Sequence, residues 1–337
     1  MSIGVLFFYP IDKLGGNFME YVWLILGFVL LIKGADWFVD GASALSKKFG
    51  IPSVVIGLTV VAFGTSLPEA SVSISAALSQ SSGISVGNVV GSNIFNLLIV
   101  AGASAVFCPI RVDKSIIKKD MPFSFLITLA LLFLTFSIFP NSAPDNVLTR
   151  ADGIILLLFF TLFMFYTFRA ALNAPAPEEN KNEKIMPLWQ QLLFILVGLA
   201  GIVIGGDRTV EGAKVIASNF GMSDSLIGLT IVAIGTSLPE LVTSIVAARK
   251  GESDIAIGNV IGSNIFNILF VLGVSSVITP IVINASDIVN SMYDIIIVAL
   301  VTLLVYIPIV KTKKISRPVG AVMVIAYVIY TAYIIMR

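Results

Sequence analysis

One 40-residue segment occurs twice in this chain, and the duplication limits the possible folds more than any other feature. A shift of 171 residues places Gly57–Asn96 on Gly228–Asn267 without a gap, and 26 of the 40 positions are identical. Agreement of this extent does not arise by chance, so the two halves descend from one ancestral unit. The fold must therefore accommodate two copies of one structural unit.

The chain is too apolar to be a water-soluble protein. Hydrophobic residues fill 57% of its 337 positions and charged residues only 12%, whereas about a quarter of a soluble domain is charged. Apolar runs long enough to cross a bilayer recur along the sequence. We predict an all-α polytopic membrane protein with ten spans, near residues 20–44, 52–79, 84–107, 122–139, 151–169, 188–217, 223–248, 255–279, 292–310 and 317–336.

Each half contains five predicted spans, and this odd number sets the relative orientation of the halves. Residues 19–169 form the first five-helix repeat and residues 188–337 the second, joined by a short charged linker at 170–187. After five crossings the chain reaches the opposite face, so the second repeat enters the membrane inverted. Inverted repeats are typical of secondary transporters, whose binding sites lie near the bilayer midplane where the repeats meet.

Basic residues predict which face is cytoplasmic, because Lys and Arg are retained on that side. The connections that follow odd-numbered spans hold fifteen of the 21 basic residues. These are Lys47, Lys48, Arg111, Lys114, Lys118, Lys119, Arg169, Lys181, Lys184, Arg249, Lys250, Lys311, Lys313, Lys314 and Arg317. We therefore expect a plasma-membrane protein with a cytoplasmic linker and with both termini outside the cell.

The first repeated motif, GTSLPE, places polar groups inside two apolar spans, at Gly64–Glu69 and Gly235–Glu240. Helical spacing puts its polar residues on one stripe, and Pro68 and Pro239 leave carbonyl oxygens without N–H partners. Oxygen ligands suit hard cations such as Ca²⁺ and Na⁺. Two facing glutamates would repel without a cation between them, so we predict a shared cation site. The alternative is that each glutamate packs against a serine or is protonated. The candidate ligands are Ala62, Thr65, Ser66 and Glu69, and in the second copy Ala233, Thr236, Ser237 and Glu240.

The second repeated motif is GNVVGSNIFN at Gly87–Asn96 and GNVIGSNIFN at Gly258–Asn267. Its asparagines and serine recur every four residues and form a stripe, while its GxxxG pairs allow helices to approach closely. Intramembrane asparagines often join helices, so only some are expected to face the ions. We expect Ser92, Ser263, Asn96 and Asn267 to line the site, and Asn88, Asn93, Asn259 and Asn264 to hold helices or tune it.

Further charges lie in or near the first and sixth spans. They are Lys33, Asp36 and Asp40, and Asp207, Arg208, Glu211 and Lys214. Because opposite charges are three or four residues apart in each helix, we expect them to pair within that helix. A role in gating or ion access is the alternative.

The composition argues against an enzyme. The chain has no histidine, which removes the commonest general base and the commonest transition-metal ligand. Gly205-Gly206-Asp207 is a weak hint of an intramembrane protease, and no partner aspartate motif accompanies it. We infer no organic cofactor, no nucleic acid and no obligate protein partner. A cation channel is a further alternative, which would conduct without a counter-ion.

The paired GTSLPE and GNVxGSNxFN strings resemble the two alpha-repeats of the sodium/calcium exchangers, in the cation/calcium exchanger superfamily. The resemblance covers essentially the whole chain, and proton/calcium members usually carry a different string that resembles GNAxE. It implies a Ca²⁺ site made by Glu69, Glu240 and the backbone oxygens of Thr65 and Thr236. It also implies Na⁺ sites that share the glutamates and add Ala62, Ser66, Ser92, Ala233, Ser237 and Ser263, with Asn96 beside them.

Asn267 departs from part of the family, since potassium-dependent exchangers and some archaeal relatives have aspartate at that position. The short linker also departs from animal exchangers, which carry a large calcium-sensing insert. The resemblance therefore implies a prokaryotic, potassium-independent antiporter that exchanges Na⁺ for Ca²⁺ by alternating access, with both ions as transported substrates. An H⁺/Ca²⁺ exchanger, or an exchanger of other divalent cations, with the same fold is the alternative.

Overall fold

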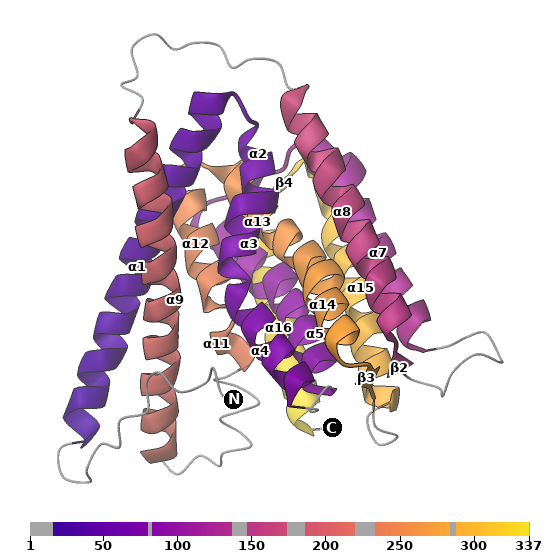
Figure 1. Cartoon of the computed structure of the whole chain (residues 1–337). Coiled ribbons are helices and arrows are strands. Elements are labelled where there is room, and N and C mark those ends of the chain that lie inside the picture. The colour runs from indigo at the N-terminus through magenta and orange to yellow at the C-terminus, as the bar shows by residue number, and fades with distance from the viewer. Residues whose placement is uncertain are drawn as a thin grey trace.

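The computed structural model describes residues 16–79, 83–136, 147–173, 186–219, 233–283 and 288–336, and these are mostly helical (Figure 1). The first half contains α1 (Gly16–Phe49), α2 (Ser53–Ile56), η1 (Gly57–Val61), α3 (Ala62–Thr65), α4 (Leu67–Leu78), α5 (Gly83–Phe95), η2 (Asn96–Val100), α6 (Ala101–Phe107), η3 (Ile116–Asp120), α7 (Met121–Thr135) and α8 (Arg150–Leu172). The second half contains α9 (Leu188–Asn219), α11 (Ala233–Gly235), α12 (Leu238–Arg249), α13 (Ser253–Phe266), η5 (Asn267–Val271), α14 (Leu272–Ile278), α15 (Ile288–Thr312) and α16 (Arg317–Met336).

Seven helices in the described part of the chain are long and apolar enough to cross a membrane. They are Met19–Phe49, Ile84–Phe107, Arg150–Leu172, Leu188–Asn219, Ser253–Ile278, Ile288–Thr312 and Arg317–Met336. A bent pair, Ser53–Thr65 with Leu67–Leu78, makes an eighth candidate, its halves inclined by 49°. The predicted seventh span begins in residues 220–232, which lie outside the described ranges. A helical membrane protein is confirmed, and the count of ten spans stays a prediction.

Two spans widen into a single π-helical turn at the second repeated motif. α5 continues through η2 into α6, and α13 continues through η5 into α14. The π turns begin at Asn96 and Asn267, which are equivalent positions of the two halves. Such turns interrupt the regular helical hydrogen bonding and are frequent at functional sites.

Two short strand pairs join connections from opposite halves of the chain. β1 (Ile110–Arg111) pairs with β4 (Lys314–Ile315), and β2 (Val147–Leu148) pairs with β3 (Ile281–Val282), both antiparallel. The first pair lies at the upper end of the molecule in Figure 1 and the second at the lower end. Two of the predicted basic connections therefore share one face, as the alternation of spans requires.

α1 and α9 lie side by side at one edge of the molecule (Figure 1), and each has its most extensive packing with the other. Glycines bring their backbones together. A Cβ on Gly34 would lie 2.7 Å from the carbonyl oxygen of Gly198, and one on Gly205 would lie 2.4 Å from the backbone N of Leu31. No side chain fits at those distances, so the helices cross with main chain against main chain.

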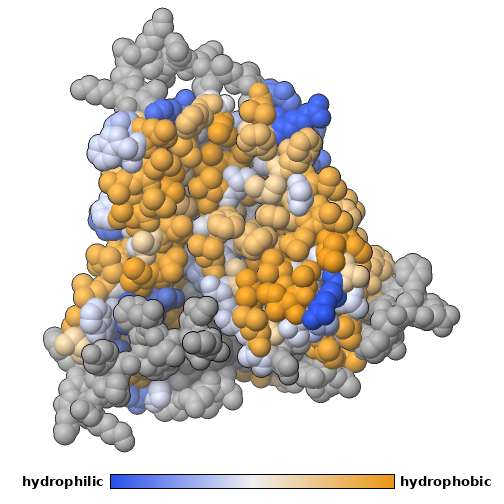
Figure 2. All heavy atoms as spheres, in the orientation of Figure 1, coloured by the Kyte–Doolittle hydropathy of each residue, from blue (hydrophilic) through white to orange (hydrophobic). Residues whose placement is uncertain are grey.

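α13 is the central helix, and the surface of the molecule is apolar. All residues from Ile255 to Phe266 are buried, whereas α16 exposes large apolar side chains such as Ile325 and Ile329. Figure 2 shows apolar side chains over most of the visible face, with hydrophilic ones toward its upper and lower ends. An exposed apolar band of this kind fits a surrounding of lipid.

Candidate functional site

Each GTSLPE motif lies where one helix ends and another begins. α3 ends and α4 begins on either side of Ser66, whose backbone has φ −86° and ψ 8°. Thr236 and Ser237 separate α11 from α12, and Ser237 has a similar backbone, with φ −94° and ψ 8°. The prolines occupy the first turn of α4 and α12, where no intrahelical N–H donor is needed. The kink predicted from the proline is present in the first copy, where the two helices are inclined by 49°.

The break places Glu69 and Glu240 in the first turn of α4 and α12. Helix N-termini carry unpaired N–H groups and the positive end of the helix dipole, which together favour a carboxylate. Both glutamates are fully buried. The local fold thus compensates part of the unfavourable free energy of holding a carboxylate inside an apolar protein.

The two motifs meet through crossed hydrogen bonds. Ser66 Oγ donates to Glu240 Oε1 at 2.9 Å, and Ser237 Oγ donates to Glu69 Oε1 at 2.8 Å. Each serine therefore serves the glutamate of the other half. The crossed pairs bring both acidic side chains to one buried centre, which the sequence predicted.

The second motif completes the surroundings of each carboxylate from α5 and α13. Ser92 Oγ lies 3.4 Å from Glu69 Oε1, and Ser263 Oγ lies 3.4 Å from Glu240 Oε1. These equal distances repeat the arrangement in both halves. Both serines lie beside the carboxylates, as we expected of residues that line the site.

Asn88 and Asn259 form hydrogen bonds to the helices that carry Glu69 and Glu240. Asn88 Nδ2 donates to the carbonyl oxygen of Glu69 at 3.2 Å and to Ser73 Oγ at 3.0 Å. Asn259 Nδ2 donates to the carbonyl oxygen of Glu240 at 3.4 Å and to Ser244 Oγ at 3.0 Å. Both side chains contact backbone and serine groups of the neighbouring helix, which matches the helix-holding role predicted for them.

Several buried oxygens of the site have no hydrogen-bond partner among the residues that the structure describes. They are Glu69 Oε2, Glu240 Oε2, Asn96 Oδ1, Asn267 Oδ1 and Thr236 Oγ1. Buried acceptors without a hydrogen-bond partner are rare and unfavourable, and a bound ion is one explanation for them. The first four are carboxylate or amide oxygens, which are the ligand types of hard cations.

The carboxylates also lack cationic side chains. Neither Glu69 nor Glu240 forms an ion pair with a Lys or Arg in the ranges that the structure covers. No group of three or more acidic, His or Cys residues gathers in those ranges either. A cation held here would be bound by two carboxylates and otherwise by neutral oxygens, with a combined protein charge of −2 to match it.

The remaining predicted ligands differ in their surroundings. Thr65 is fully buried and its hydroxyl donates to Asn259 Oδ1 at 2.9 Å. The carbonyl oxygen of Ala62 still accepts the backbone N of Ser66 at 3.0 Å. A release of that carbonyl by the proline kink was expected and is not seen, because the last turn of α3 closes before the break. A carbonyl oxygen has a second lone pair that is able to bind a cation. Ala233 begins α11, and residues just before it lie outside the described chain.

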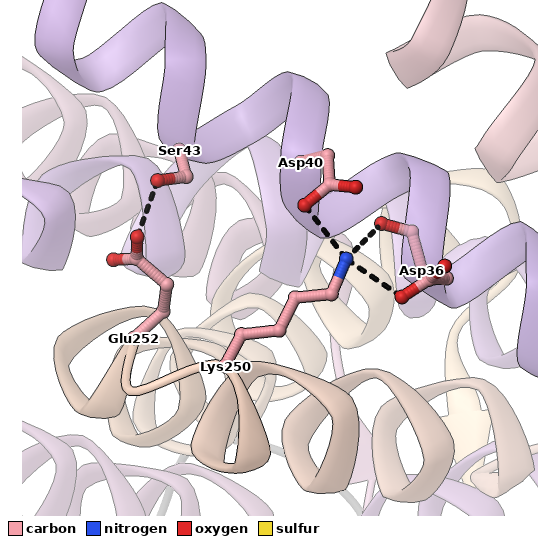
Figure 3. A network of polar contacts seen from close by, with 5 residues as sticks. All are labelled: Asp36, Asp40, Ser43, Lys250 and Glu252. Atoms are coloured by element: carbon pink, nitrogen blue, oxygen red, sulfur yellow. Dashed lines mark hydrogen bonds and ion pairs between the residues drawn. The ribbon is translucent and has the colours of Figure 1, made fainter. Parts of the chain in front are cut away.

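The charges of α1 do not pair within their own helix as we expected. Lys250 Nζ lies 2.6 Å from Asp36 Oδ1 and 2.6 Å from Asp40 Oδ1, and it donates to the backbone oxygen of Asp36 at 2.9 Å (Figure 3). Ser43 donates to Glu252 beside this ion pair. The prediction was wrong because Lys250 ends α12 within reach of α1, a tertiary contact that helical spacing does not reveal.

In α9 the predicted internal pairing is confirmed for Lys214 and Glu211, whose charged atoms lie 3.3 Å apart. Arg208 lies over the ring of Trp23 in α1, 5.5 Å from its centroid. Helical spacing did not predict the roles of Lys250, Ser43 and Glu252. The one available signal was that Lys250 and Glu252 replace serines at the equivalent positions of the first repeat.

Comparisons with known proteins point to one family. The family described as sodium/calcium exchanger protein matches residues 19–169 and 190–336. A putative antiporter CaxA of Alkalimonas amylolytica is 42% identical over 316 residues, which cover 92% of this chain and 96% of that protein. The sodium/calcium exchanger MaX1 of Methanosarcina acetivorans is 37% identical over 298 residues, covering 78% and 84%. A solved structure of the sodium-calcium exchanger NCX_Mj superposes with a TM-score of 0.80 at 33% identity, covering 94% and 99%.

Proposed function

Because the chain belongs to the sodium/calcium exchanger family of membrane transporters, we propose that it exchanges Na⁺ for Ca²⁺ and needs no K⁺. The observation that carries the proposal is the buried centre shared by Glu69 and Glu240. Each carboxylate has one oxygen bonded by a serine of the other half and one oxygen without a partner in the described part of the chain. An ionised carboxylate at mid-membrane costs at least about 2.5–3.5 kcal/mol, and a bound cation offsets that cost.

Ligand chemistry supports Ca²⁺ and Na⁺ as the two substrates. The proposed Ca²⁺ ligands are the two glutamates with the backbone oxygens of Thr65 and Thr236. The proposed Na⁺ ligands add Ser66, Ser237, Ser92, Ser263, Asn96 and Asn267, with the backbone oxygens of Ala62 and Ala233. Since both ions use the same carboxylates, they compete, and only one species fills the site at a time. This competition couples the two fluxes.

The proposed architecture is ten spans in two inverted five-helix repeats, at 19–169 and 188–337, with a cytoplasmic linker at 170–187. The protein lies in the plasma membrane with both termini outside. In transport, an occupied site is neutral and permits α1 and α9 to shift against the core, whereas an empty site of charge −2 resists the shift. A ligand drives such a change only through its different affinity for the two states.

Counter-transport in proteoliposomes tests this function. The purified protein is reconstituted, and uptake of ⁴⁵Ca²⁺ is measured with Na⁺, K⁺ and H⁺ gradients imposed one at a time. We expect an outward Na⁺ gradient alone to drive uptake, without K⁺ and without a pH gradient. Uptake that follows only the H⁺ gradient would identify an H⁺/Ca²⁺ exchanger, and uptake without any counter-ion would identify a channel.

A further inference from the structure

Four asparagines of the second motif form hydrogen bonds that cross between the two halves. Asn93 Nδ2 donates to the backbone oxygen of Asn264, and Asn264 Nδ2 donates to the backbone oxygen of Asn93, each at 3.2 Å. Asn267 Nδ2 donates to Asn93 Oδ1 at 3.1 Å, and Asn96 Nδ2 donates to Asn264 Oδ1 at 3.2 Å. All four side chains are buried.

The first two contacts fix the orientation of every amide in this set. A backbone carbonyl only accepts, so Asn93 must turn its NH₂ group toward Asn264. Its Oδ1 then faces Asn267, whose NH₂ group must donate to it. Asn267 Oδ1 is thereby left buried and without a partner. Asn264 orients Asn96 in the same way, and Asn96 Oδ1 also has no partner among the described residues.

We infer that Asn93 and Asn264 are positioning residues for the cation site. Asn93 turns the amide of Asn267, and Asn264 turns the amide of Asn96, so that each presents a carbonyl oxygen to a bound cation. Residues that hydrogen-bond to a metal ligand fix its orientation in this way, and their loss typically lowers the metal affinity about 10- to 100-fold. The inference rests on the proposed cation site, and it adds that the dependence crosses from one repeat to the other.

Double-mutant cycles test the crossed dependence. The half-saturating Na⁺ and Ca²⁺ concentrations are measured for Asn93→Ala, Asn267→Ala and the double variant. We expect each single change to weaken ion affinity about 10-fold or more, and the double variant to be no weaker than Asn267→Ala. The matched cycle of Asn93→Ala with Asn96→Ala should instead give losses that multiply, because Asn96 depends on Asn264.

Equal coupling in both cycles, or multiplying losses in the first, would overturn the inference and leave Asn93 a general packing residue. If Asn93→Ala does not fold, Asn264→Ala with Asn96→Ala gives the same test from the other half. If the wild type shows no sodium-driven uptake, the proposed function fails, and the cycles are then measured by Ca²⁺ binding calorimetry. Crossed coupling there would still support the positioning role.

A second inference follows from a difference between the repeats at the end of α1. Lys250 joins α12 to Asp36 and Asp40 of α1, and Glu252 accepts a bond from Ser43 (Figure 3). A shift of 171 residues places these acidic positions on Asp207 and Glu211 of α9. It places Lys250 on Ser79 and Glu252 on Ser81. The acidic partners are therefore present in both repeats, but the lysine that joins them to the core is present in one.

The geometry points to Lys250 as a one-sided latch, which holds α1 against the core at the basic face and favours the conformation closed there. At the other face the position equivalent to Lys250 holds the uncharged Ser79, so the two conformations differ in free energy. A partly exposed ion pair is worth little by itself, up to about 1 kcal/mol. The latch therefore biases the equilibrium without preventing exchange.

Apparent Ca²⁺ affinities at the two faces test the latch, because a ligand's apparent affinity scales with the fraction of protein open to it. In vesicles of the two opposite orientations, Lys250→Ser should strengthen apparent affinity at the basic face about two- to five-fold and weaken it at the other face. Ser79→Lys, which supplies the missing cation, should have the reverse effect.

Lys214→Ser is the control, since Lys214 pairs within α9 and its loss should leave the ratio of the two affinities unchanged. An unchanged ratio in Lys250→Ser would overturn the latch. If that variant does not fold, the double change of Asp36 and Asp40 to Asn removes the same contact from the α1 side. It should shift the ratio in the same direction.

Discussion

The hydroxyl of Ser66 lies 2.9 Å from Oε1 of Glu240, a residue 174 positions further along the chain. Its counterpart, Ser237, lies 2.8 Å from Glu69 Oε1. Each half therefore completes the acidic site of the other, and neither half forms a whole site alone.

Replacing either crossed serine should weaken ion exchange to a similar degree. Ser66→Ala removes the shortest serine contact of Glu240 Oε1 and leaves the longer one to Ser263, and Ser237→Ala does the same to Glu69 and Ser92. A hydrogen bond to a charged group contributes about 1.5–3 kcal/mol, so the half-saturating Ca²⁺ concentration should rise about ten-fold or more. Ca²⁺ titration of sodium-driven uptake measures this. Ser71→Ala is the control, because Ser71 is exposed and bonds only its own helix; a loss as large there would contradict the assignment.

The glycines between α1 and α9 should tolerate no added side chain. Gly205→Ala places a Cβ 2.4 Å from the backbone of Leu31, and main chain cannot yield as a flexible side chain can. Such overpacking destabilises by about 1–3 kcal/mol, so the melting temperature in detergent should fall. Gly206→Ala is the matched control on the same helix, since its Cβ would have its nearest contact at 3.7 Å. Equal melting temperatures for both variants would show that the helices do not pack as described.

Stability should depend on pH through Asp120, which lies just before the fourth proposed span. Burial raises the pKa of Asp120 to about 7, with Lys119 lowering it and Asp113 raising it. A pKa that is higher in the folded state stabilises the protein below the unfolded pKa of about 4, and this contribution is lost as pH rises toward 7. Asp120→Asn should therefore flatten the decline in melting temperature between about pH 4 and pH 7. A variant whose decline matched the wild type would exclude Asp120 as its cause.

Much of this molecule could be predicted from its sequence, because a duplicated motif reports on geometry as well as ancestry. The two GTSLPE motifs, each with a glutamate in an apolar span, predicted a shared acidic site. Glu69 and Glu240 do lie at one buried centre. Local backbone at Ser66 could not be predicted from helical spacing, since proline can either kink a helix or begin one. The contact of Lys250 with Asp36 was missed because it joins helices far apart in sequence, and periodicity within one helix carries no information on that.

The crossed asparagine contacts also join different helices, so spacing within one helix could not predict them. Asn93 and Asn264 were assigned to holding helices, which their bonds to opposite backbone oxygens support. Their effect on the orientation of Asn96 and Asn267 depends on which atoms face each other, and only coordinates give that. Residue type and spacing predicted that these asparagines lie near the site. The three-dimensional contacts show that Asn93 and Asn264 orient Asn267 and Asn96.

Sodium-driven ⁴⁵Ca²⁺ uptake by Glu69→Gln and Glu240→Gln proteoliposomes tests the central claim most directly. Glutamine keeps the size and the hydrogen-bonding oxygen but removes the charge, so a cation loses one of its two carboxylates. Each variant should fold, because the buried charge is removed, and each should lose uptake, while Glu211→Gln on the exposed face of α9 transports normally. Uptake at the wild-type rate in either site variant would contradict the account that these two residues jointly bind the exchanged ions.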